Sequence, residues 1–241
     1  MNYQLYLTTT VDPESLKDGS GILVLESSNY SKAAIEQIKN KGYKVLGYIS
    51  IGTIEKKYNW YKTYKKYSLD SLEDRLNKTY VDVREKEWRD FIIRRAKEIK
   101  ESKDIDGWWC DDLDIYEYYS SSKMFVACAS VISRIKKLGG YLMVNGGSKF
   151  FDYALNHDID LSTVDGVTQK EVYSSITSYK GSGKFSRQKK SSREFYEKLL
   201  NRLKKRGIET YLLEYTRNND VKVQIKKAKV TGYYISESIN L

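Results

Sequence analysis

The sequence predicts an α/β fold in which residues 1–241 form a single (β/α)8 TIM barrel, with a long excursion after the third strand. Three observations predict it. Eight β-rich runs lie along the chain, patterns typical of amphipathic helices separate most of them, and 241 residues is close to the ~250 typical of such barrels. The same pattern also permits an open, doubly wound sheet, which stays the alternative at this point.

The strands are expected where β-branched and aromatic residues gather in short runs. These runs are residues 3–7, 22–25, 44–49, 107–111, 141–145, 164–167, 210–213 and 232–235. Before three of them a helical pattern ends in basic residues and a glycine, at Gly42, Gly139 and Gly207. Glycine tolerates the left-handed conformation that follows a helix, and cations favour the negative end of the helix dipole. These repeated junctions indicate βα units and a parallel sheet.

Helices are expected where apolar residues recur at helical spacing, within residues 34–38, 88–99, 124–135 and 195–203. Ser191 and Glu194 have the spacing of a capping box before the last helix. Residues 59–82 lack an apolar period, so they form the excursion after strand three, and such excursions often cover a site. The Lys-, Ser- and Gly-rich residues 179–192 are expected to form a mobile loop.

Composition excludes several classes of protein. The chain carries 42 basic and 32 acidic residues, and no apolar run approaches the ~20 residues that cross a bilayer. The first 13 residues lack the pattern of a signal peptide, although earlier removal of one stays open. Cys110 and Cys128 lie in apolar segments, so buried thiols are expected and a disulfide framework is not.

The single histidine, His157, excludes the catalytic and metal sites that need several imidazoles. It lies in a polar stretch and is expected at the surface. The chain also lacks the glycine-rich motifs that cradle nucleotide phosphates. Carboxylates and tyrosines therefore remain as the candidates for chemistry, and 22 tyrosines is well above ordinary usage.

Three carboxylates crowd the end of the predicted fourth strand, at Asp111, Asp112 and Asp114. Their mutual repulsion raises the pKa of at least one, and such a cluster binds a cation or performs acid/base and nucleophilic chemistry. The spacing of a calcium-binding loop is absent, so we expect no metal. Capping of a helix N-terminus is the structural alternative for Asp112 and Asp114.

Glu171 follows the predicted sixth strand, 60 residues after Asp111. Two carboxylates from the strand ends of one barrel are the minimal equipment for cleaving a glycosidic bond. Aromatic residues near these strand ends could stack on sugar rings, with core packing as the alternative. They are Tyr48, Tyr116, Tyr173 and Tyr215, with Trp108 or Trp109.

Five segments together resemble the successive motifs of glycoside hydrolase family 114. They are residues 45–52, 106–116, 145–147, 165–171 and 213–215, and the resemblance runs from about residue 6 to residue 236. The family contains endo-α-1,4-polygalactosaminidases and related barrel hydrolases of exopolysaccharides. The resemblance thus implies an endo-acting, retaining glycosidase for polysaccharide that contains α-1,4-linked galactosamine or N-acetylgalactosamine, with no cofactor.

The resemblance also implies roles for individual residues. The family's strand-four aspartate falls on Asp111, the expected nucleophile, and its strand-six glutamate falls on Glu171, the expected general acid/base. Substrate-binding positions are expected along the cleft, at Tyr48, Asp112, Asn145, Tyr215, Glu214 and Tyr116.

The chain departs from the family pattern at two places. Thr53 stands where the family commonly has a glutamate, and Glu55 comes two residues later. Lys170 directly precedes Glu171, and an adjacent ammonium group would lower the pKa of a general acid, unless the two side chains diverge. A catalytically weak or silent barrel that binds glycan is therefore the alternative function.

Most of the excess positive charge lies in residues 170–206, which hold 12 basic and three acidic residues. A solvated surface is the ordinary interpretation of such a run, and contact with an anionic polymer or cell surface is the sharper one. A nucleic-acid footprint is a third interpretation, which the sequence favours least. With a polysaccharide substrate, we expect an extracellular or cell-surface protein, while a cytoplasmic one stays open.

Overall fold

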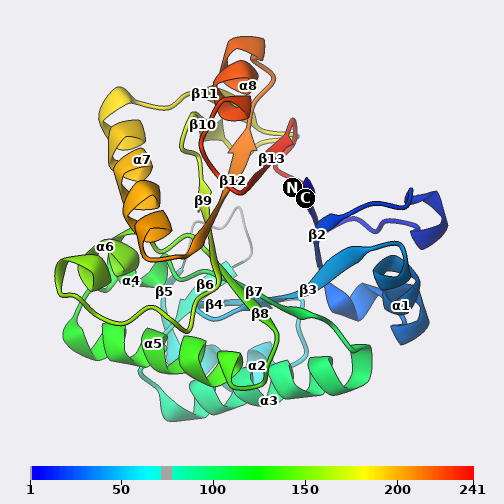
Figure 1. The fold of residues 1–241 in the computed structure, drawn as a ribbon. Coiled ribbons are helices and arrows are strands. Elements are labelled where there is room, and N and C mark those ends of the chain that lie inside the picture. The colour runs from blue at the N-terminus through cyan, green and yellow to red at the C-terminus, as the bar shows by residue number, and fades with distance from the viewer. Residues whose placement is uncertain (1, 72–77) are drawn as a thin grey trace.

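The computed structural model describes residues 2–71 and 78–241, and its centre is a barrel of eight parallel strands. Around the barrel the order is β1-β13-β12-β9-β8-β7-β3-β2 (Figure 1). The strands are β1 (Asn2–Tyr6), β2 (Gly21–Leu25), β3 (Tyr43–Ser50), β7 (Gly107–Asp111), β8 (Tyr141–Asn145), β9 (Gly166–Lys170), β12 (Glu209–Tyr215) and β13 (Gly232–Ser236). The predicted TIM barrel is confirmed, and the doubly wound sheet is not what forms.

The barrel closes between the first and last strands of the chain. β1 pairs with β2 over five positions, but it meets β13 at one pair only, Asn2 with Tyr233. Accordingly, the two ends of the chain lie next to each other in Figure 1. β9 begins two residues later than predicted and extends to Lys170. Thr168 lies inside the barrel, where Tyr3 and Trp109 are its hydrogen-bonding neighbours.

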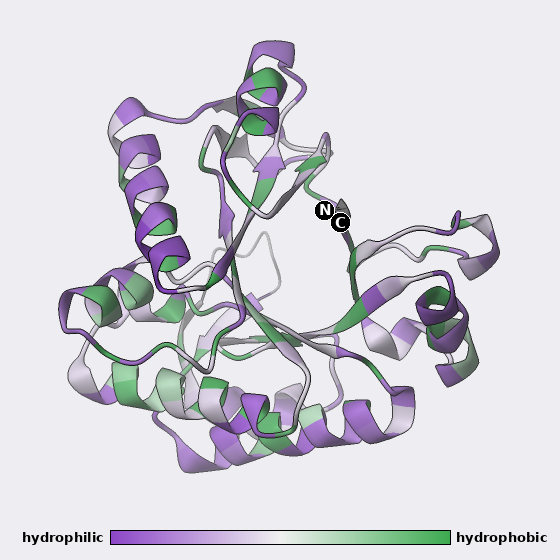
Figure 2. Cartoon of the chain, viewed as in Figure 1, coloured by the Kyte–Doolittle hydropathy of each residue, from purple (hydrophilic) through white to green (hydrophobic). Residues whose placement is uncertain are grey.

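Helices cover the outside of the barrel. The longer ones are α1 (Lys32–Asn40), α3 (Lys86–Lys103), α5 (Ser122–Lys136), α6 (Ser148–Asn156), α7 (Lys190–Lys205) and α8 (Asn219–Lys226), with single turns at α2 (Tyr61–Tyr64) and α4 (Ile115–Tyr118). The four predicted helices are confirmed. Their buried faces pack on the barrel, while the outer face of α7 is mostly hydrophilic (Figure 2).

The predicted capping box of α7 is wrong. The helix already begins at Lys190, after Lys189 as N-cap, and no side chain caps it. Ser191 is therefore inside the first turn and its hydroxyl cannot take the capping place. The loop predicted over residues 179–192 is also corrected, because β10 (Ser174–Ser178) and β11 (Lys184–Arg187) form an antiparallel hairpin there.

The excursion after β3 folds into a small sheet of its own. β4 (Thr53–Glu55), β6 (Lys78–Val81) and β5 (Ser68–Ser71) form three antiparallel strands in the order β4-β6-β5. Residues 72–77, which the predicted excursion includes, lie outside the described residues. Because β4 follows β3 after a two-residue turn, the sheet lies at the C-terminal end of the barrel strands, the end where TIM barrels place active sites.

Candidate active site

Asp111 and Asn145 meet where two neighbouring strands end. Asp111 is the last residue of β7 and Asn145 is the last residue of β8. The Asn145 amide nitrogen donates a hydrogen bond of 2.6 Å to Asp111 Oδ1, and both side chains are buried. The sequence expected both residues in the cleft, and their direct contact follows from the pairing of β7 with β8.

Asp112 directs its side chain to the start of the excursion after β3 and accepts hydrogen bonds there. Its φ of 64° is left-handed, which directs its side chain toward the loop after β3. Its Oδ2 accepts hydrogen bonds from the hydroxyls of Ser50, at 2.7 Å, and Thr53, at 2.6 Å. Thr53 thus binds the carboxylate next to Asp111.

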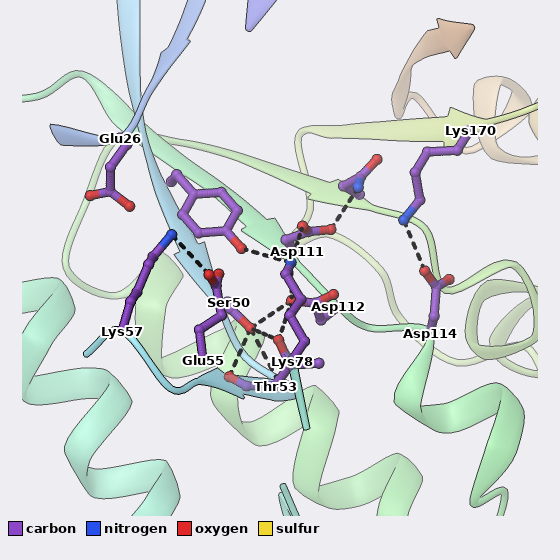
Figure 3. Close-up of polar contacts among 12 residues, drawn as sticks. Glu26, Ser50, Thr53, Glu55, Lys57, Lys78, Asp111, Asp112, Asp114 and Lys170 are labelled. Carbon is purple, nitrogen blue, oxygen red and sulfur yellow. Dashed lines mark hydrogen bonds and ion pairs between the residues drawn. The ribbon is translucent and has the colours of Figure 1, made fainter. Parts of the chain in front are cut away.

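Lys78 is a site residue that sequence reasoning missed. Its ammonium group lies 3.6 Å from Asp112 Oδ2, 4.0 Å from Asp111 Oδ2 and 3.5 Å from the Tyr48 hydroxyl. Figure 3 shows it between these two aspartates. Lys78 is the first residue of β6, in a segment without a motif, so only the pairing of β6 with β4 brings it to the site.

Lys170, the last residue of β9, also enters this cluster. Its ammonium group forms an ion pair with Asp114 Oδ2 at 3.2 Å (Figure 3). Asp114 Oδ1 in turn accepts a hydrogen bond of 2.7 Å from the backbone of Gly147. A side chain on Gly146 would collide with this carboxylate, and one on Gly147 would collide with the Leu113 side chain, which explains the two glycines after Asn145. The side chain of Asp114 caps no helix.

Glu171 diverges from Lys170. Its φ of 57° is left-handed, and its Oε2 accepts a hydrogen bond of 2.7 Å from the backbone N–H of Ile176 in the hairpin. Burial raises the pKa of Glu171 above its ordinary value, against the opposing effects of this hydrogen bond and of Lys170. The direction suits a group that must carry a proton.

The pKa values of Asp111 and Asp112 are shifted in opposite directions. Burial, followed by the neighbouring Asp112, raises the pKa of Asp111, although Lys170 and Lys78 oppose the shift. Burial would also raise the pKa of Asp112, but Lys78 and the Thr53 hydroxyl outweigh it and the pKa is lowered. Two ammonium groups thus lie beside two buried carboxyl groups whose pKa values are shifted in opposite directions.

Tyr48 and Tyr215 line this region, as the sequence expected. The Tyr48 hydroxyl faces Lys78, and the negative charges of Asp112 and Asp111 add to burial in raising its pKa. Burial is also the main cause of the raised pKa of Tyr215, and the charges of both Glu171 and Asp111 contribute. Tyr215 therefore lies close enough to both carboxylates of the expected catalytic pair for their charges to raise its pKa.

Glu214 and Tyr116 do not offer a surface for substrate. Glu214 is fully buried, and its two oxygens accept hydrogen bonds from the backbone of Val172, Tyr173 and Ser174 and from the Ser174 hydroxyl. Burial raises its pKa to about 7. It faces away from the cleft because it alternates with Tyr215 along the strand, and it anchors the turn after Glu171.

Tyr116 belongs to the packing around the barrel. It is 5% exposed, and its ring contacts Phe125, Phe150 and Tyr153 edge-on. The spacing after Asp111 predicted a position near the cleft, but the turn α4 directs the ring toward α5 and α6. The core alternative is therefore the correct one for Tyr116.

Ammonium groups supply the positive charge of the site. Within residues 2–71 and 78–241, no group of three or more His, Cys, Asp or Glu side chains is arranged to hold a metal ion.

No helix in the described part of the chain is long and apolar enough to cross a membrane. Cys110 and Cys128 are buried and free, as the sequence predicted.

A TIM barrel with acidic residues at the C-terminal ends of its strands is typical of barrel hydrolases. Residues 1–212 match Glycoside-hydrolase family GH114, and the chain belongs to this family. It is therefore a glycosidase by family. The match ends within β12, so the strand that closes the barrel, β13, lies beyond it.

Solved structures share the fold at low identity. The glycoside hydrolase domain of PelA from Pseudomonas aeruginosa has a TM-score of 0.81 at 14% identity, over 99% of this chain and 96% of that one. Aspergillus fumigatus Ega3, solved in complex with galactosamine, has a TM-score of 0.73 at 14% identity, over 99% of this chain and 91% of that one. No curated protein matches the chain.

Proposed function

We propose that this chain is an endo-acting, retaining glycosidase for exopolysaccharide containing α-1,4-linked galactosamine or N-acetylgalactosamine. Asp111 is the nucleophile and Glu171 is the general acid/base. The observation that carries the proposal is the position of Asp111, at the end of a barrel strand and fixed by Asn145 at 2.6 Å, in a member of this glycosidase family. The galactosamine bound to Ega3 supports the choice of sugar.

The two carboxylates suit different steps of such a reaction. In the first step Asp111 forms a bond to the anomeric carbon while the bond to the leaving oxygen breaks and Glu171 gives that oxygen its proton. In the second step Glu171 takes a proton from water, and the water oxygen replaces Asp111 on the sugar. The raised pKa of Glu171 favours the protonated form that the first step needs.

Asp111 has to be ionised to act as a nucleophile, and its burial works against this. Lys78 and Lys170 both stabilise its negative charge, and the Asn145 amide donates to the oxygen that would not attack. The two lysines are therefore positioning groups for the nucleophile. In this proposal they compensate for the low polarity around Asp111.

One observation favours the alternative function, a barrel that binds glycan and cleaves it weakly or not at all. Lys170 ends β9 and points its ammonium group toward the carboxylate cluster, while Glu171 is bound to the hairpin through Ile176. A cation thus lies near the expected nucleophile, while the expected acid/base is held by the hairpin. The two functions differ in what the loss of Asp111 should do.

The decisive experiment measures release of reducing ends from polymers of galactosamine, N-acetylgalactosamine and glucosamine. Asp111→Asn and Glu171→Gln should each abolish cleavage by the wild-type chain, since each removes a group that takes part in bond cleavage. Asp160→Asn is the matched control, because Asp160 is exposed and its hydrogen bonds within residues 2–71 and 78–241 go to Ser162. Activity that persists in both variants would refute the assignment.

Absence of cleavage by wild type, with glycan binding that survives Asp111→Asn, would establish the glycan-binding function. The panel also tests the sugar, because the polymers differ in ring configuration and in acetylation. We further propose that the protein acts outside the cell or at the cell surface, where such polymers occur.

The basic residues 170–206 form a second part of the proposal, a contact with an anionic surface. Some of their charges are paired, since Arg187 contacts Asp220 and Arg202 contacts Asp152. Lys184, Lys198 and Lys205 are exposed. Retention on a sulfated matrix should fall steeply with salt, and Lys198→Glu with Lys205→Glu should weaken it. Retention independent of these two lysines would contradict the contact.

A further inference from the structure

A small pocket adjoins the candidate active site between the end of β2 and helix α3. It measures about 30 Å³, and it shares Tyr48 and Ser50 with the active site. Its charged groups are Glu26, which follows β2, and Arg95 of α3, and the hydroxyls of Thr53 and Tyr58 also line it. Figure 3 shows Glu26 on the opposite side of the cluster from Lys170.

Arg95 lines this pocket and is half-buried. Its guanidinium group stacks on the Trp60 ring at 3.9 Å from the centroid. No residue of the described chain accepts a hydrogen bond from it, and it forms no ion pair there. A guanidinium group carries five N–H donors. Those of Arg95 stay accessible, since none of its nitrogens is among the fully buried unpaired atoms of the described residues, so an acceptor bound in the pocket can receive hydrogen bonds from them.

Glu26 offers the complementary acceptor. Its Oε1 accepts from the backbone and hydroxyl of Ser28, at 3.2 and 2.7 Å. Among the described residues, its Oε2 has one distant donor, the Tyr58 hydroxyl at 3.4 Å. A bound group with an N–H could therefore donate to Oε2. The opposite charge of Arg95 reduces the attraction of this pocket for a simple cation.

The remaining wall is apolar. Phe91 and Ile92 of α3 and the ring of Trp88 line it. About 10 to 15 Å³ of such volume holds one water molecule, so the pocket holds roughly two or three. That is too small for a sugar ring, but it is similar to the three heavy atoms of an acetyl group, the part of an acetamido group beyond its nitrogen.

We infer that the pocket binds the acetamido group of an N-acetylated amino sugar held at the barrel mouth. Arg95 donates to the acetamido carbonyl, Glu26 accepts from its N–H, and the apolar wall contacts its methyl group. Each part of the group thus meets its chemical complement. The inference rests on the proposed function and adds a preference to it: at this position the substrate is acetylated.

Binding tests the inference without any cleavage. Oligosaccharides of α-1,4-linked galactosamine, either fully acetylated or fully free of acetyl groups, are titrated calorimetrically into the Asp111→Asn chain. The acetylated form should bind about 10- to 100-fold more tightly, the range expected for hydrogen bonds to charged groups. Adding Arg95→Met should remove this ratio, and Arg95→Lys should retain part of it.

Arg94→Met is the matched control, since Arg94 is the exposed neighbour on the same helix and bonds to Tyr64. It should leave the ratio unchanged. Equal binding of both oligosaccharides, or a ratio that survives Arg95→Met in a chain with unaltered thermal stability, would overturn the inference and leave the proposed function intact. Tighter binding of the deacetylated form would overturn it in favour of a cation site. Binding of neither form would overturn both.

Discussion

Replacing Lys78 by methionine tests how the excursion supports the active site. The ammonium group lies 3.6 Å from Asp112 Oδ2 and 4.0 Å from Asp111 Oδ2, and its side chain is 20% exposed. At an effective dielectric constant of about 20, each contact is worth roughly 4 to 5 kcal/mol before desolvation. Removing one partner of a buried pair usually costs about 3 to 5 kcal/mol, because the other charge is left unpaired.

We therefore expect Lys78→Met to lower the free energy of unfolding by about 3 kcal/mol or more at pH 7, measured by urea denaturation. Lys78→Arg keeps the charge and should lose less. Lys57→Met is the control, because the Lys57 side chain is 60% exposed and its pair with Glu55 should contribute under about 1 kcal/mol.

The effect of Lys78→Met should also depend on pH. The pKa of Asp112 is lowered in the folded chain below its ordinary 3.8, so its ionisation contributes stability above that pH and loses it as the pH falls. Lys78 is the main cause of the lowering. Without Lys78, the unpaired Asp112 carboxylate takes up a proton at a higher pH. The difference in free energy of unfolding between wild type and Lys78→Met should therefore be larger at pH 7 than at pH 4. A difference under 1 kcal/mol at both pH values would refute this reasoning.

Three further substitutions probe the supports of the site. Gly52→Ala would bring a methyl group against the backbone oxygen of Asp112, so it should cost about 2 kcal/mol or more in urea unfolding and lower activity, whereas unchanged activity would contradict the close approach. Glu214→Gln presents an amide to the backbone donors of Val172 and Ser174, so it should lower the free energy of unfolding by about 1 to 3 kcal/mol. It should also reduce kcat, because Glu214 anchors the turn after β9. An unaltered kcat would argue against that anchoring role. Tyr3→Phe removes the nearer of the two acceptors of Trp109 Nε1, at 3.0 Å, and leaves Thr168 at 3.4 Å. It should lower the unfolding free energy by about 1 kcal/mol with little change in KM, measured by denaturation and steady-state kinetics.

Much of the site could be read from the sequence because parallel strands end at a common face. Asp111 and Asn145 are each the last residue of a predicted strand, and the pairing of those strands makes their contact almost unavoidable. Lys78 had no comparable signal. It reaches the same face through an antiparallel pair of short strands in a segment that lacks an apolar period.

Side-chain direction explains the two expected substrate positions that the structure corrects. Glu214 and Tyr215 are neighbours in sequence, yet alternation along β12 buries one carboxylate outside the barrel and leaves the tyrosine near the carboxylates. Tyr116 lies five residues after Asp111, but a turn of helix separates them and places the ring among Phe125 and Phe150.

By itself the sequence determined the barrel, its strands and helices, and the acidic residues at its C-terminal face. These depend on local periodicity, on glycines that end helices, and on the rule that parallel strands share an end. The tertiary structure alone decided which charges pair, that Lys78 and Lys170 balance the carboxylates, and that Glu26 and Arg95 share a pocket. Those contacts join residues far apart in the chain, and their geometry exists only once the barrel has closed.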